Sequence, residues 1–186
     1  MTTLHLLRHA QTTPPTGTTD VPLSTQGRDD AKALVPVLQS LQITRIVSSP
    51  CLRAIETIQP FLSESNIKIE TDVRLREREM PFAKSPQEHI KRVQMSFQNQ
   101  DFAPEGGESF LEASARALAC LKALTQEGRS GLLLVGHGQC LTLILRAFDR
   151  SADFDFWSAL PTPALVELNV HEGQLQGDFR RLETNF

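Results

Sequence analysis

Short runs of apolar residues, each bounded by polar or turn-forming positions, are spread along the chain and predict β-strands. The run at 131–135 is apolar without interruption, which is typical of a strand buried on both faces of a sheet. The last two runs are joined through Glu172 and Gly173. The predicted strands are residues 3–7, 43–47, 67–71, 131–135, 164–170 and 174–181.

Segments with apolar residues at helical spacing separate most of these strands. In the first of them, Ala31, Leu34, Val35 and Leu38 form one apolar face of a helix that follows the sequence Ser24-Thr25-Gln26-Gly27. Further helices are predicted at 52–62, 87–99, 109–125 and 139–148. Strands that alternate with helices predict an α/β fold, a three-layer sandwich in which a mainly parallel central sheet is flanked by helices. Because no linker or repeat interrupts the pattern, residues 1–186 are expected to form one domain.

The helix at 109–125 has the strongest start signal. Ser109 is expected to cap its N-terminus, and Glu112, three residues later, completes a capping box. Two other segments lack any periodic pattern. Residues 11–19 are rich in proline, glycine and threonine and predict a loop. Residues 74–86 are charged and contain two prolines, so we expect an irregular excursion over the sheet.

Composition narrows the class of protein. The chain has 186 residues, 40% of them hydrophobic, and a formal net charge of −3, which gives no general attraction to nucleic acid or to an anionic membrane. The cysteines, Cys51, Cys120 and Cys140, are too few for a disulfide framework and form no CxxC pair for zinc. No histidine spacing indicates a metal site. No apolar run is long enough for a membrane span or a signal peptide, so a cytoplasmic protein is expected.

Polar side chains suited to phosphate chemistry follow three of the predicted strands. Arg8 and His9 follow the first strand, Arg53 comes soon after the second, and His137 follows the strand at 131–135. Because ligands of open α/β sheets bind beyond the carboxyl ends of the strands, we expect these side chains to share one rim. Guanidinium groups give paired donors to phosphate oxygens, and an imidazole with an unprotonated nitrogen can attack phosphorus. A second histidine can bind the phosphoryl oxygens during transfer.

Phosphoryl transfer from an ester also needs an acid that protonates the leaving oxygen. Glu77 and Glu79 are the candidates, although a charged segment is often only a solvated face. The arginines at 74, 76 and 78 are expected either to contact an anionic part of the substrate or to lie in solvent.

Six short blocks of the chain resemble a known family when they are read in order. They are Leu7-Arg8-His9-Ala10-Gln11-Thr12, Asp20-Val21-Pro22-Leu23-Ser24 with Gly27, Ser48-Ser49-Pro50-Cys51-Leu52-Arg53-Ala54 with Thr57, Asp72-Val73-Arg74-Leu75-Arg76-Glu77, Gly106-Gly107-Glu108-Ser109, and Val135-Gly136-His137-Gly138. Their content and order resemble the histidine phosphatase superfamily, which includes the cofactor-dependent phosphoglycerate mutases. Ala10 stands where the family usually has glycine.

The resemblance implies a role for each of the candidate residues. His9 would be the phosphorylated nucleophile, Arg8, Arg53 and His137 would hold the phosphoryl group, and Glu77 would be the proton donor, with Glu79 as the alternative. Family members of this type need no metal, and we expect no cofactor.

Two further substrate contacts are predicted at less typical positions. Many relatives have an asparagine that orients the phosphate where this chain has Pro15, so Thr16 is expected to substitute for it. The backbone N–H groups of Gly138 and Gln139 open a predicted helix and are expected to add an anion-binding contribution.

These features predict a histidine acid-type phosphatase that cleaves a small phosphomonoester through a phosphohistidine on His9. The short loop before Asp20 favours a phosphatase over a mutase, because mutases must shelter the phosphoenzyme from water. A phosphoglycerate mutase-type transferase and a non-catalytic module that binds phosphorylated ligands remain as alternatives.

Several classes of substrate are compatible with the sequence. The loop at 17–23 is similar to that of the α-ribazole phosphatases of cobalamin assembly, and small protein-phosphohistidine phosphatases are an equal possibility. The expected partner is therefore a small phosphorylated metabolite or a phosphohistidine protein. The sequence does not specify the oligomeric state.

Overall fold

A single mixed sheet organises the computed structural model, which describes residues 2–14, 20–81, 83–126, 130–170 and 177–183. The strand order is β3-β2-β4-β1-β5-β6. The pairs β1/β4, β2/β4 and β2/β3 are parallel, whereas β1/β5 and β5/β6 are antiparallel, so β5 alone runs against the other strands of this sheet. The strands are β1 (Thr2–Arg8), β2 (Arg45–Ser48), β3 (Ile69–Thr71), β4 (Leu132–Gly136), β5 (Ala164–Val170) and β6 (Gly177–Leu182).

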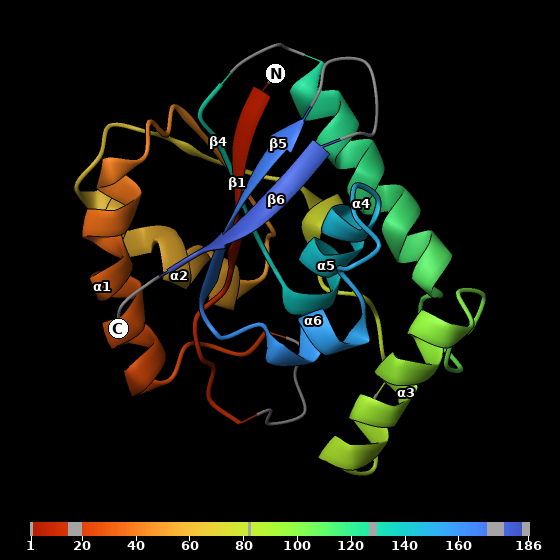
Figure 1. The fold of residues 1–186 in the computed structure, drawn as a ribbon. Coiled ribbons are helices and arrows are strands. Elements are labelled where there is room, and N and C mark those ends of the chain that lie inside the picture. The colour runs from red at the N-terminus through yellow and green to blue at the C-terminus, as the bar shows by residue number, and fades with distance from the viewer. Residues whose placement is uncertain (1, 15–19, 82, 127–129, 171–176, 184–186) are drawn as a thin grey trace.

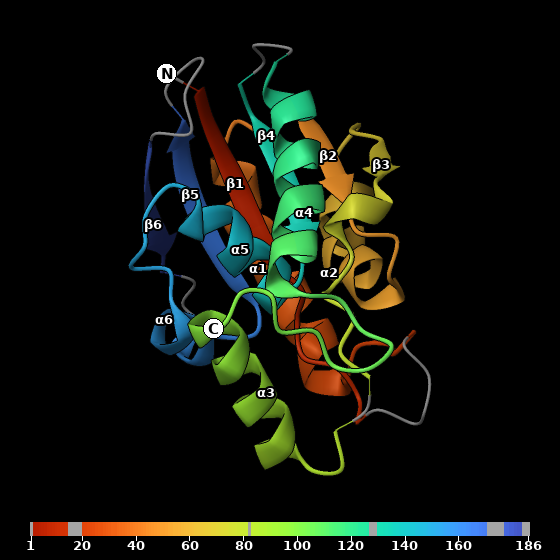
Figure 2. The ribbon, with the colours of Figure 1, turned by 90° about the vertical axis from the view of Figure 1, so that its right-hand side faces the viewer.

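Helices cover both faces of this sheet and give the three-layer α/β sandwich predicted from the sequence. In Figure 1 the sheet stands between α1 and α2 on one side and α4 and α5 on the other, and in Figure 2 α4 and α5 lie in front of it. In both views α3 and α6 lie beyond the lower ends of the strands. The helices are α1 (Thr25–Ser40), α2 (Leu52–Ser63), α3 (Pro86–Gln98), α4 (Phe110–Thr125), α5 (Gly138–Arg146) and α6 (Phe154–Ala159), with a 3₁₀ turn η1 (Val73–Leu75).

The two faces of the sheet bury two separate apolar clusters. Leu6 of β1 and Leu134 of β4 pack with the helices on the α4 and α5 side. Leu7 and Val135, the next residue of each strand, pack with the α1 and α2 side. Because successive side chains of a strand point to opposite faces, a strand between two helical layers must be apolar at nearly every position. This explains the uninterrupted apolar run in β4.

The structure departs from the predicted elements mainly at their ends. A turn of 3₁₀ helix, η1, begins the segment expected to be irregular, and α6 was not predicted at all. Six residues are too few to show helical periodicity, and α6 begins at an N-cap, Asp153, whose carboxylate accepts from the N–H of Phe156 at 3.1 Å. Glu172 and Gly173 lie outside the described residues. No helix in the described ranges is long and apolar enough to cross a membrane.

Candidate active site

The parallel strands deliver the predicted residues to one edge of the sheet. Arg8 ends β1 and is paired with Gly136, which ends β4, while the backbone N–H of His9 donates to the carbonyl oxygen of Gly136 at 3.0 Å. His137 follows at the N-cap of α5. The rings of His9 and His137 meet edge to face with their centroids 5.2 Å apart. The shared rim expected from the sequence is therefore present.

The tautomer of His9 is set by the backbone carbonyl group of the next residue. The Nδ1 atom lies 2.8 Å from the carbonyl oxygen of Ala10, which can only accept, so Nδ1 carries the proton and Nε2 keeps its lone pair. Burial lowers the pKa of His9 to about 4, and the nearby charges of Arg53 and Arg8 act in the same direction. At neutral pH this side chain is an uncharged base with one free nitrogen lone pair.

His137 is fully buried, and both of its ring nitrogens contact the protein. Arg53 donates from Nε to Nδ1 of His137 at 3.1 Å, so the proton of the ring is on Nε2, which lies 2.8 Å from the hydroxyl oxygen of Ser49. Burial lowers the pKa of His137 well below its ordinary value, and the charge of Arg53 lowers it further. In this arrangement His137 positions the Arg53 guanidinium, and the direct contact between His137 and a phosphoryl group stays a prediction.

The guanidinium of Arg8 is hydrogen-bonded to the protein through one of its nitrogens but not through another. Its Nη1 donates to the carbonyl oxygens of Leu160 and Pro161, whereas its buried Nε has no hydrogen-bond partner among the described residues. Gly138 lies directly against this guanidinium. A Cβ at Gly138 would be 3.1 Å from Cζ of Arg8 and 3.1 Å from Nε1 of Trp157. The absence of a side chain at Gly138 leaves room for the Arg8 guanidinium. Contact between Gly138 and substrate stays a prediction.

The carboxylate of Glu77 is bound at the N-terminus of α5, beside His137. Its Oε1 accepts from the N–H of Cys140 at 3.0 Å, and its Oε2 accepts from the N–H of Gln139 at 3.2 Å. A carboxylate at this end of a helix is stabilised by the helix dipole. The N–H of Gln139, expected to bind a substrate anion, is therefore occupied by Glu77. Glu79 lies further out, 3.4 Å from Arg76 and with a side chain that is 58% exposed.

The three arginines of the segment after η1 have different environments. Arg74 pairs with Asp72 at 2.7 Å, and Arg76 pairs with Glu108 at 3.3 Å. Arg78 is buried and donates to the carbonyl oxygen of Glu108 at 2.9 Å, among other oxygens. The expectation that Arg78 lies in solvent is wrong, because its guanidinium donates to oxygens inside the protein. Contact between Arg78 and substrate stays a prediction.

Two of the sequence blocks that resemble the family, at 20–27 and 48–57, make hydrogen bonds to the segment that follows His9. The hydroxyl of Thr57 accepts from the N–H of Ala10 at 2.9 Å, and the N–H of Ser24 donates to the carbonyl oxygen of Gln11 at 2.9 Å. A Cβ at Gly27 would lie 2.0 Å from that same oxygen of Gln11, so only glycine lets α1 approach so closely. Thr16, the predicted phosphate-orienting residue, lies outside the described residues.

A cleft of about 920 Å³ opens over these groups. Arg8, Arg53 and Glu77 line it together with side chains for which no role was predicted from the sequence. These include Trp157 and the half-buried His89, whose ring centroids are 6.5 Å apart. The other lining residues are Cys51, Arg76, Arg78, Glu79, Met80, Pro81, Ala83, Lys84, Ser85, Pro86, Ile90, Gly106 and Gln139.

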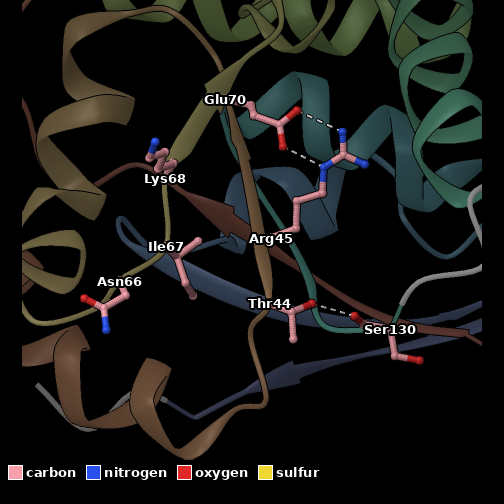
Figure 3. A pocket seen from close by; sticks show the side chains of 7 residues that line it. All are labelled: Thr44, Arg45, Asn66, Ile67, Lys68, Glu70 and Ser130. Atoms are coloured by element: carbon pink, nitrogen blue, oxygen red, sulfur yellow. Dashed lines mark hydrogen bonds and ion pairs between the residues drawn. The ribbon is translucent and has the colours of Figure 1, made fainter.

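A second hollow of about 700 Å³ lies near the opposite end of the sheet, where β2 begins (Figure 3). Four of its lining residues bond to one another in pairs. Arg45 makes two hydrogen bonds with Glu70, at 2.7 and 2.8 Å, and the hydroxyl of Thr44 donates to the carbonyl oxygen of Ser130 at 2.9 Å (Figure 3). Asn66, Ile67 and Lys68 complete its lining. Because it is remote from the carboxyl ends of the strands, it is a poor candidate for the reaction site.

Comparisons with known proteins find one family and several relatives. The family model of the histidine phosphatase superfamily (branch 1) matches residues 4–181. A 2,3-bisphosphoglycerate-dependent phosphoglycerate mutase of Rhizobium etli is 29% identical over 171 residues, 81% of each chain. Fructose-2,6-bisphosphatase TIGAR B of Danio rerio is 32% identical over 130 residues, 66% of this chain and 49% of that protein. The solved mycobacterial glucosyl-3-phosphoglycerate phosphatase superposes with a TM-score of 0.78 at 25% identity, over 97% of both chains.

Proposed function

Because the chain belongs to the histidine phosphatase superfamily, we propose that it is a metal-independent phosphohydrolase that cleaves a small phosphomonoester through a phosphohistidine on His9. The observation that carries this proposal is the state of His9. Its Nδ1 is tied to Ala10, its pKa is about 4, and Arg8 and Arg53 are close enough to lower that pKa. An uncharged nucleophile beside two cations is the arrangement that attack on a phosphate dianion requires.

The proposed reaction has two steps. In the first, the lone pair on Nε2 of His9 attacks phosphorus, the bond from phosphorus to the ester oxygen breaks, and Glu77, in its protonated form, gives its proton to the leaving oxygen. In the second, water attacks the phosphohistidine, Glu77 takes a proton from that water, and phosphate leaves with His9 restored. Arg8 and Arg53 compensate the charge of the transferring group throughout.

A phosphoglycerate mutase-type transferase is the second candidate. The similarity to the Rhizobium etli mutase favours it, whereas the similarity to the two phosphatases favours hydrolysis. The two candidates share the first step and differ in whether water or a second alcohol accepts the phosphoryl group.

Phosphate release from an aryl phosphate and a panel of small phosphomonoesters, with EDTA present, tests the proposal. We expect release by the wild-type protein and a loss of at least about 10³-fold in His9→Ala, because the nucleophile is removed. Circular dichroism of the variant checks that it is folded. Turnover by a clean, folded His9→Ala preparation would exclude His9 as the nucleophile. Interconversion of phosphoglycerates with little release of phosphate would establish the mutase instead.

A further inference from the structure

The cleft has an apolar wall that the chemistry of phosphoryl transfer does not use. This wall is formed by Met80, Pro81, Ala83, Pro86, Ile90 and Trp157. Ile90 is 48% exposed, although isoleucine is usually buried, and it lies on α3 beyond the carboxyl ends of the strands. The wall reaches the phosphate site, since Trp157 and the Arg8 guanidinium are both adjacent to Gly138.

Aromatic rings stand at the inner end of this wall. The ring of Trp157 lies 6.5 Å from that of His89 and 5.8 Å from that of Phe154, measured between centroids. His89 and Trp157 both line the cleft and come from different helices, α3 and α6. Flat side chains of this kind offer apolar area and favourable ring contacts to a planar ligand group.

The cleft has few charged side chains that could bind a second anionic group of the substrate. Once Arg8 and Arg53 serve the phosphate, the other lining arginines have partners inside the protein. Arg76 is within 3.4 Å of Glu79 and 3.3 Å of Glu108, and Arg78 is buried among oxygens. Lys84 is the remaining cation among the described lining residues. A bisphosphate or a phosphorylated carboxylate carries a second anionic group, which further cations would have to bind.

From this wall and this charge distribution we propose that the substrate is a monophosphate ester of a bulky apolar alcohol, preferably one with an aromatic ring. The proposal rests on the proposed phosphohydrolase function and specifies its leaving group. The phosphate would lie on Arg8 and Arg53, and the alcohol part would lie along the wall from Trp157 to Ile90.

Two phosphate esters whose alcohols differ little in acidity test the preference for an aromatic alcohol, because the reaction itself is the same for both. Benzyl phosphate and ethyl phosphate need the same bond cleavage, so their difference reports contacts with the alcohol part. We expect kcat/KM for benzyl phosphate to exceed that for ethyl phosphate by about tenfold or more. 3-Phosphoglycerate should also react more slowly than benzyl phosphate. Equal values for the two alkyl esters, or a preference for 3-phosphoglycerate, would overturn the proposal.

A variant pair on one helix assigns the preference to the wall. Ile90→Ala shortens a lining side chain and should reduce the benzyl-to-ethyl ratio of kcat/KM about threefold or more. Met95→Ala is the matched control, because Met95 is a similarly exposed apolar residue of α3 (39%) that does not line the cleft. An unchanged ratio in Ile90→Ala, or an equal decrease in Met95→Ala, would contradict the assignment.

A binding measurement separates this proposal from the phosphohydrolase function. Benzylphosphonate and methylphosphonate cannot be hydrolysed, and calorimetry compares their dissociation constants directly. If no ester is cleaved but benzylphosphonate binds about tenfold more tightly, the apolar wall is supported and the proposed function fails. If esters are cleaved but the two phosphonates bind equally, the function stands and the wall proposal fails.

Discussion

The two histidines at the rim of the sheet differ in which of their ring nitrogens contact other protein groups. His9 has one nitrogen tied to Ala10 and one with a lone pair, whereas His137 has both nitrogens in contact with protein groups. Each of the two histidines follows a strand, and the resemblance to the family implied different roles for them; the structure adds that their ring nitrogens have different contacts. His9 keeps the free lone pair that the proposed nucleophile requires, and His137 accepts a hydrogen bond from Arg53.

The choice between the two candidate acids can be tested at this scale. Glu77→Gln should reduce kcat/KM for alkyl phosphates by about 10²-fold or more, because the leaving oxygen then receives no proton in the first step. The decrease in kcat/KM should be much smaller for p-nitrophenyl phosphate, whose leaving group is stable without protonation. Glu79→Gln serves as the matched control and should stay within about twofold, since Glu79 is exposed and pairs with Arg76. The reverse pattern would make Glu79 the acid.

At the scale of elements, the capping box of α4 is the best-defined local signal. The hydroxyl of Ser109 accepts from the N–H of Glu112 at 3.1 Å, and the Glu112 carboxylate accepts from the N–H of Ser109 at 2.8 Å. Ser109→Ala should lower the free energy of unfolding by about 1 kcal/mol. Urea unfolding measures this, with Ser63→Ala, an exposed serine at the end of α2, expected to change it by less than about 0.5 kcal/mol. Equal effects of the two substitutions would mean that the cap contributes nothing specific.

Elements with a repeated pattern could be predicted from the sequence, and those defined by contacts far along the chain could not. The apolar run of β4 and the Ser109 signal of α4 each lie within one segment, so both elements were predicted. The short α6 has no period to detect. The burial of Arg78 depends on oxygens of Ser96, Phe102 and Glu108, which only the folded chain brings together. The cleft wall was missed for the same reason.

The whole molecule is expected to lose stability in mild acid. Burial lowers the pKa of His5, His9, His89 and His137, in the case of His9 to about 4. Below pH 6.5 the unfolded chain therefore binds more protons than the folded one, and the free energy of unfolding decreases as pH falls from 6.5 towards 4. Thermal unfolding should show Tm falling by at least about 5 °C between pH 7.5 and pH 5. A constant Tm across this range would mean that these histidines protonate without cost in the folded protein.

The place of β1 in the sheet has a consequence for how the protein is made. β1 is the first strand of the chain, yet its neighbours are β4 and β5, whose residues begin at 132 and 164. When synthesis has reached residue 130, His9, Arg8 and Arg53 have been made, but neither of the strands that pair with β1 has. Contacts between segments so distant in sequence form late and slow the folding of a domain. During synthesis the candidate nucleophile therefore emerges well before the strands that hold its own strand in the sheet, and its site can be assembled only after β4 and β5 have followed.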